Sequence, residues 1–139
     1  VVFHTGLPEE EFIGKFNPKD IIPLAKEYPN LKIVLAHFGN PWIKDCSEVL
    51  KGYENVYADL SGYFIENQHI SKDQIEKFIK VMAEFKKNLG DLKKFIFATD
   101  WPLYSQKEYL DAVKLLNLTK EEKDLVFFQN ANRIFNLGL

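Results

Sequence analysis

Short apolar segments recur along the chain at intervals that helical patterns fill. They cover residues 1–3, 33–36, 56–58 and 95–98. Each segment is about as long as a buried strand, and β-branched and aromatic residues dominate them. Two of the segments are nearly continuous runs of apolar residues, which is typical of strands that are covered on both faces. The pattern therefore predicts four buried strands.

The intervals between these segments carry helix signals. Helical spacing is found over residues 17–28, with Asn17-Pro18 at its start, and over residues 42–50. A third helix begins with a capping box of Ser71 and Gln74 and ends at Gly90, a residue type that favours the position after a helix. Two further capping boxes predict the last helices, and they pair Ser105 with Glu108 and Thr119 with Glu122.

The resulting order of elements is β-α-β-α-β-α-β-α-α, without any hairpin signal. Strands that alternate with helices form a parallel sheet with right-handed crossovers. Four such units are half of an eight-unit (β/α) barrel, which usually takes about 250 residues. An open doubly wound sheet is the alternative, but no glycine-rich phosphate-binding pattern follows any of the strands. We therefore expect one α/β domain over residues 1–139.

Composition and charge exclude several classes of protein. The chain has 139 residues, of which 46% are hydrophobic and 14% aromatic, and its net charge is −2. A protein without a basic excess is not expected to bind nucleic acid. The single cysteine, Cys46, cannot form an internal disulfide, which favours a reducing compartment. Because no apolar run approaches the roughly 20 residues of a membrane span, we expect a cytoplasmic protein without membrane contact.

Polar residues that can do chemistry follow each of the expected strands. His4 ends the first segment, His37 follows the second, Asp59 and Ser61 follow the third, and Asp100 follows the fourth. In a parallel barrel the carboxyl ends of the strands converge on one mouth, where catalytic groups lie. Two imidazoles and a carboxylate at this mouth suit a divalent metal ion and proton transfer.

Structural roles compete with this interpretation. Asp100 could cap the segment that follows it, because aspartate favours turns and helix caps. Asp59 is expected to hold neighbouring loops together, His69 to be a solvated loop residue, and Cys46 to be packed on its helix. Each strand-end residue taken alone favours a structural role, whereas His4, His37 and Asp100 taken together favour a site.

Five segments in register resemble the amidohydrolase-related family, the metal-dependent TIM-barrel hydrolases and decarboxylases of the aminocarboxymuconate-semialdehyde decarboxylase type. They are Phe3-His4-Thr5-Gly6, Leu35-Ala36-His37-Phe38-Gly39, Val56-Tyr57-Ala58-Asp59-Leu60-Ser61-Gly62, Ala98-Thr99-Asp100-Trp101-Pro102 and Asn130-Ala131-Asn132-Arg133-Ile134-Phe135. The resemblance covers the whole chain. It implies the C-terminal half of a TIM barrel, namely strands five to eight and their helices.

The resemblance also implies roles for individual residues. His4 matches a histidine that ligates the catalytic metal, most often zinc. Asp100 matches an aspartate that ligates the metal and takes part in proton transfer. His37 matches a histidine that polarises the substrate or activates metal-bound water in one-metal members, and that is a ligand in two-metal members. Ser61 and Trp101 match positions that line the substrate pocket.

One departure from the family pattern is large. The first-strand His-x-His or Glu-x-His pair that supplies two more ligands is absent, since the only histidines are His4, His37 and His69. A catalytic zinc usually has three protein ligands, so we expect weak or absent metal binding and no activity in this chain by itself.

Three functions remain open at this stage. The intact protein is expected to be a hydrolase or a non-oxidative decarboxylase of a small molecule. The alternatives are a non-catalytic half-barrel and a self-associating assembly module. In every case the open sheet edges predict association, either with further copies of the chain or with the missing N-terminal barrel half.

Overall fold

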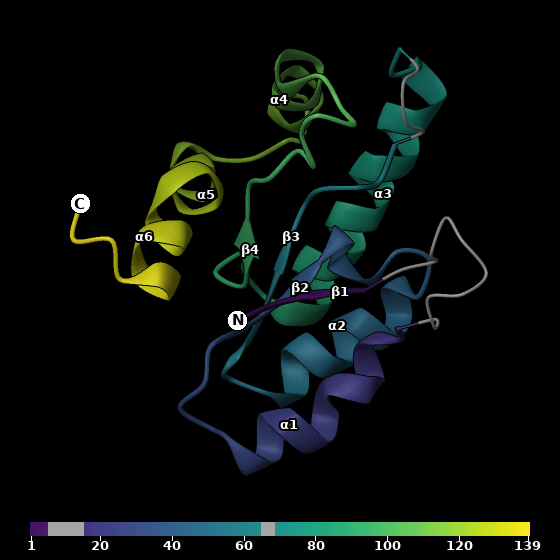
Figure 1. Ribbon diagram of the computed structural model, residues 1–139. Coiled ribbons are helices and arrows are strands. Elements are labelled where there is room, and N and C mark those ends of the chain that lie inside the picture. Colours follow the sequence, from purple (N-terminus) through teal and green to yellow (C-terminus); the bar gives the residue numbers. More distant parts are fainter. Residues whose placement is uncertain (6–15, 65–68) are drawn as a thin grey trace.

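Four parallel strands form the framework of the computed structural model, which describes residues 1–5, 16–64 and 69–139. The strands are β1 (Val2–His4), β2 (Ile33–Ala36), β3 (Val56–Asp59) and β4 (Phe95–Ile96). Their order in the sheet is their order in the chain, and every neighbouring pair is parallel. The predicted sheet is therefore confirmed, and all four carboxyl ends lie at the same edge (Figure 1).

Helical segments connect the strands and follow the last one. They are η1 (Pro18–Ile21), α1 (Ile22–Glu27), η2 (His37–Gly39), α2 (Ile43–Gly52), α3 (Lys72–Leu89), α4 (Gln106–Lys114), α5 (Lys120–Asp124), the π-helical η3 (Leu125–Gln129) and α6 (Asn130–Phe135). The expected limits of α3 are confirmed, because Ser71 and Gln74 form a reciprocal capping box and Gly90 ends the helix at φ 85°.

The two faces of the sheet have different coverings. Alternate residues such as Leu35 and Ala58 point into the main core, which also contains buried residues of α1, α2, α3 and α4. The residues between them point to the other face, where Val34, Tyr57 and Ile96 pack against Ile134 of α6. Figure 1 shows this division, with α1 and α2 on one side of the strands and α5 and α6 beside β4. Helices therefore cover both faces of the central strands.

The segment that follows residue 16 differs from the expected single helix over residues 17–28. Asn17 caps a 3-10 turn through a reciprocal capping box with Asp20, and the α-helix begins only at Ile22. Pro23 lies in the first turn of α1. A proline has no N–H to donate and is tolerated only at the start of a helix, so it divides the segment in two.

Strand β4 is shorter than the predicted segment 95–98. The N–H of Phe97 donates to the carbonyl of Val126 in η3 at 2.9 Å, so the backbone leaves the sheet after Ile96.

The predicted capping box at the start of α4 is only half formed. Ser105 accepts a hydrogen bond from the N–H of Glu108, whereas the Glu108 carboxylate lies 2.7 Å from Nδ1 of His69.

Candidate active site

The carboxyl edge of the sheet brings three of the expected site residues together. His4 is the last residue of β1, His37 follows β2 directly, and Asp100 lies four residues after the end of β4. The Nε2 atom of His37 is 3.2 Å from Nδ1 of His4, and the two rings meet edge to face with centroids 4.9 Å apart. The Nδ1 atom of His37 is 3.9 Å from Oδ2 of Asp100. His37 is therefore the central member of the cluster.

The backbone at this edge has an unusual conformation. His37 and Asp100 both have φ 62°, and Phe38 has φ 36°. Non-glycine residues rarely adopt positive φ, and each instance costs on the order of 1–3 kcal/mol unless the surroundings impose it. Such conformations cluster at functional sites. The strain at two of the expected catalytic positions therefore supports a functional reading of this edge.

A chain of hydrogen bonds holds the His37 ring in place. The Oδ1 atom of Asp59 accepts from the backbone N–H groups of His37 and Ser61, each at 3.0 Å, and from the Ser61 hydroxyl at 2.6 Å. The Ser61 hydroxyl oxygen in turn forms a hydrogen bond of 2.9 Å with Nδ1 of His37. Both Asp59 and Ser61 are buried. The expected role of Asp59 in holding neighbouring loops together agrees with these contacts.

These contacts determine which ring nitrogens carry protons. A carboxylate only accepts hydrogen bonds, so the single hydroxyl proton of Ser61 points to Asp59. The hydroxyl must then accept from an N–H at Nδ1 of His37, which leaves Nε2 of a neutral His37 ring as an acceptor. His4 donates to that acceptor through Nδ1. The chain of donors therefore leaves Nε2 of His4 without a proton, and this is the form of a nitrogen that binds a metal ion.

The electrostatic surroundings favour a neutral His4. Partial desolvation of the ring lowers the pKa of His4, and the neighbouring His37 lowers it further, whereas Asp100 raises it. The net direction is downward. A histidine must be neutral to ligate a metal ion, so the environment favours the ligating form.

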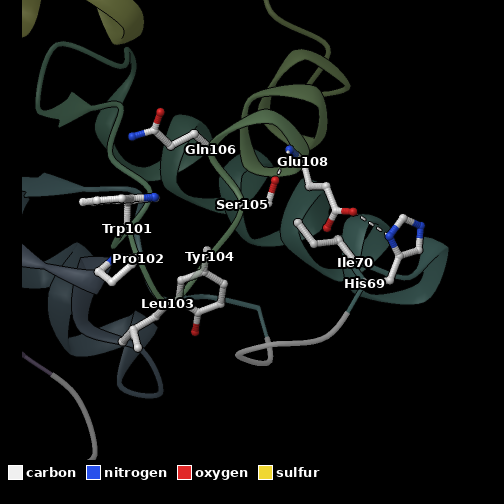
Figure 2. Close-up of a pocket in the computed structure, with 9 residues that line it drawn as sticks. All are labelled: His69, Ile70, Trp101, Pro102, Leu103, Tyr104, Ser105, Gln106 and Glu108. Carbon is white, nitrogen blue, oxygen red and sulfur yellow. Dashed lines mark hydrogen bonds and ion pairs between the residues drawn. The ribbon is translucent and has the colours of Figure 1, made fainter.

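Ser61 and Trp101, the expected substrate-contacting residues, lie in different surroundings. Ser61 is buried and its hydroxyl is engaged by Asp59 and His37. Trp101 is 68% exposed and follows Asp100 directly. It belongs to the wall of a cavity of about 540 Å³, shown in Figure 2. The cavity is lined by His69, Ile70, Trp101, Pro102, Leu103, Tyr104, Ser105, Gln106 and Glu108.

The sequence did not indicate the pair of His69 and Glu108 in this cavity wall. His69 is largely exposed, as expected of a solvated residue, but its Nδ1 atom pairs with the Glu108 carboxylate (Figure 2). The two residues are separated by 38 others, and Glu108 has the position of an ordinary capping residue. No local pattern could have joined them. Residues 66–68, which precede His69 in the chain, lie outside the described part, as does Gly6 of the first family-like segment.

The described residues do not form a complete metal site. Imidazole and carboxylate are suitable ligands for zinc, but a catalytic zinc usually takes three protein ligands. Across residues 1–5, 16–64 and 69–139, no group of three or more histidine, cysteine, aspartate or glutamate side chains could hold a metal ion. His4 and Asp100 therefore do not close a metal site by themselves.

Across the described ranges of the chain, no helix combines the length and the apolar character needed to cross a membrane.

Comparisons with known proteins find similar sequences and similar folds. A family model described as Amidohydrolase matches residues 1–137. A curated relative, Protein fluG of Emericella nidulans, is 24% identical over 154 residues, which cover 97% of this chain and 17% of that protein. The chain thus spans about a sixth of the length of this relative.

Solved structures resemble the chain more closely in fold than in sequence. An amidohydrolase from Burkholderia multivorans with bound zinc has a TM-score of 0.74 at 16% identity, over 97% of this chain and 53% of that one. A putative 2-pyrone-4,6-dicarboxylic acid hydrolase from Pseudomonas putida has a TM-score of 0.66 at 17% identity, over 99% and 52%. A dihydroxybenzoic acid decarboxylase from Polaromonas sp. JS666, with bound manganese and the inhibitor 2-nitroresorcinol, has a TM-score of 0.61 at 17% identity, over 84% and 37%.

These likenesses establish the fold class. The four parallel βα units match about half of the first two solved chains, so the expected half of a TIM barrel is confirmed and the open doubly wound sheet is set aside. The catalytic and ligand roles of His4, His37, Asp100, Ser61 and Trp101 stay predictions.

Proposed function

The chain belongs to the amidohydrolase family, and on this basis we propose that it carries the catalytic edge of a metal-dependent hydrolase or decarboxylase of a small organic molecule. The observation that carries the proposal is the meeting of His4, His37 and Asp100 at the carboxyl edge of the sheet. In barrels of this kind, that edge is where active sites lie.

His4 and Asp100 are the proposed ligands of a divalent metal ion. The hydrogen-bond chain through Asp59, Ser61 and His37 leaves Nε2 of His4 without a proton, as a ligand must be. Zinc is the expected ion, and two of the similar solved structures hold zinc or manganese according to their names. Such an ion supplies a Lewis acid and lowers the pKa of bound water. The remaining ligands would have to come from outside the described residues.

His37 is the proposed carrier of protons. An imidazole suits proton transfer at neutral pH. The Ser61 hydroxyl holds the ring by its Nδ1 atom, so Nε2 would take up the proton, in place of the hydrogen bond that it accepts from His4. The carboxylate of Asp100, 3.9 Å from Nδ1, would stabilise the charged ring. This arrangement serves both hydrolysis, in which water must lose a proton, and decarboxylation, in which carbon must gain one.

Trp101 and the cavity beside it are the proposed entrance for the substrate. Trp101 exposes most of its indole next to Asp100 and contributes to a cavity of about 540 Å³, which is large enough for a small organic acid. The hydrolase and decarboxylase among the similar structures act on dicarboxylic and dihydroxybenzoic acids according to their names. A small, planar carboxylic acid is therefore the proposed class of substrate.

A non-catalytic role is the second candidate, and the incomplete ligand set favours it. Without three suitable ligands among the described residues, the chain would be inactive by itself. It would then serve as the C-terminal half of a barrel that another segment completes, or as a module that pairs with a second copy.

The substitution Asp100→Asn in the intact protein separates these functions. It removes a charge without changing volume, so the fold should persist while turnover falls by at least about a hundredfold and the bound metal is lost. Elemental analysis and circular dichroism on the same preparation provide the controls. Full turnover in this variant would favour the non-catalytic role. The absence of metal and activity from the unmodified intact protein would favour it as well.

A further inference from the structure

A second cavity lies at the opposite edge of the sheet from the candidate active site. Its volume is about 320 Å³, and its walls come from the ends of α2 and α3, from β3 and from α6. Four of its lining residues are cations, Lys51, Lys93, Lys94 and Arg133, and two are acids, Glu54 and Asp91. The cavity therefore has an excess of positive charge in a chain whose net charge is negative.

Two of the cations share one aromatic ring. The Nζ atom of Lys94 lies 5.1 Å from the centre of the Tyr57 ring, and the guanidinium carbon of Arg133 lies 5.7 Å from the same centre. Desolvation lowers the pKa of Lys94, and although Glu54 raises it, the positive charge of Arg133 lowers it further. Like charges held this close to one ring repel each other, and an anion between them would relieve the repulsion.

Among the described residues, the acids near this pair neutralise it only in part. The Glu54 carboxylate is fully exposed and 3.9 Å from Lys94, and the Asp91 carboxylate lies 2.8 Å from Lys93. Within the described ranges, Arg133 has no carboxylate within ion-pair distance.

The free donors of the two side chains differ. Lys94 donates to the carbonyls of Tyr53 and Glu54, the two residues that follow α2. Arg133 uses only Nη2, which donates to the carbonyl of Lys93 at 2.7 Å and lies 3.3 Å from Oδ1 of Asn130. The Nη1 and Nε groups of Arg133 therefore have no acceptor in the part of the chain that the structure describes. Each of these free groups can donate a charge-assisted hydrogen bond to an oxygen of an anion such as phosphate.

We propose that this cavity binds a phosphate group, either inorganic phosphate or a small phosphomonoester, between Arg133 and the neighbouring lysines. The dianion would accept from a free N–H group of Arg133, at Nη1 or at Nε, and would be attracted by Lys51 and Lys93. Its position at the far edge of the sheet makes it a binding site separate from the cluster of His4, His37 and Asp100.

Titration calorimetry of the protein that carries this chain, with inorganic phosphate and with glycerol 3-phosphate at constant ionic strength, tests the proposal. We expect saturable one-to-one binding, and the tighter of the two ligands identifies the source of the phosphate. The substitution Arg133→Gln should weaken binding by at least about tenfold, because it removes the charged donor.

A matched pair of lysine substitutions on α2 guards against a folding defect in the arginine variant. Lys51→Gln changes an exposed residue of the cavity and should weaken phosphate binding by a few fold, whereas Lys44→Gln changes an exposed lysine outside it and should leave binding unchanged. Equal affinity in all three variants, or no saturable binding of either ligand, would overturn the proposal.

Discussion

Gly62 lies directly against the imidazole ring of His37: a Cβ atom on Gly62 would come within 2.2 Å of His37 Nδ1. The residue also has φ 63°, which side-chain-bearing residues rarely adopt. This close approach and the hydrogen bond with Ser61 both restrain the ring at Nδ1. The position of His37 therefore depends on a glycine at residue 62.

The substitution Gly62→Ala should displace His37 and reduce turnover of the intact protein by at least about tenfold, because small misplacements of catalytic groups are costly. The backbone strain should also lower the free energy of unfolding by about 1–3 kcal/mol. Gly52→Ala is the matched control, since a Cβ there meets nothing within 4 Å. Steady-state kinetics and urea denaturation measure both effects, and equal kinetics for the two variants would contradict the assignment of His37.

Ser61 offers a test between positioning and substrate contact. Its hydroxyl bridges Asp59 and His37 in the buried interior, so Ser61→Ala should lower kcat by about tenfold and leave KM nearly unchanged. A substrate-contacting residue would instead raise KM when it is truncated. The variant Ser61→Thr keeps the hydroxyl and should recover part of kcat. An effect on KM alone would restore the substrate-binding hypothesis.

His37 should act on protons and should not be needed to hold the metal ion. We expect His37→Asn in the intact protein to lower kcat by about two orders of magnitude or more, with metal content close to that of the unmodified protein. The reason is that Nδ1 of His37 is already engaged by Ser61, and Nε2 faces His4. Elemental analysis together with kinetics distinguishes proton transfer from metal ligation, because joint loss of metal and activity would make His37 a ligand.

The sequence predicted the parallel order of the strands and the strand-end positions of His4, His37 and Asp100, because both follow from local patterns. Apolar runs of strand length and helix caps depend only on residues that are close in the sequence. In a parallel sheet the carboxyl ends of the strands then lie at one edge. The meeting of His4 and His37 at 3.2 Å is a consequence of that topology.

Features that depend on tertiary contacts were beyond the reach of these patterns. The early end of β4 results from a hydrogen bond to Val126, and the half-formed cap of α4 results from the pairing of Glu108 with His69. Ser61 was assigned to the substrate pocket by resemblance, and only the packed structure shows its hydroxyl between Asp59 and His37.

Asn130 should be a major contributor to stability. It is fully buried, and its side-chain amide donates to the carbonyls of Leu92 and Phe95 at 2.9 and 2.7 Å. The substitution Asn130→Ala would leave two buried carbonyls without these donors, so we expect the free energy of unfolding to fall by about 2–4 kcal/mol. Asn132→Ala is the control, because its contacts reach only the exposed C-terminal Leu139 and should contribute less than about 1 kcal/mol. Urea denaturation of both variants measures the difference.

Among the described residues, β1 and β4 each pair with one strand only, so their outer edges are open. An open edge presents unpaired N–H and C=O groups and promotes pairing with another chain. The inward face of the sheet is the one that carries Val34, Tyr57 and Ile96. Helix α6 covers part of it through Ile134, but Val2 of β1 stays 55% exposed.

We therefore expect the chain to form dimers or larger species in proportion to its concentration, as measured by light scattering coupled to size-exclusion chromatography. A charged side chain on an edge strand blocks such pairing, so Val2→Lys should shift the distribution toward monomer while the circular dichroism spectrum stays the same. Lys26→Gln, an exposed change on α1 away from the edge, should leave the distribution unaltered. A monodisperse monomer at every concentration would mean that α6 already provides enough cover for the inward face and that the edges of β1 and β4 do not drive association.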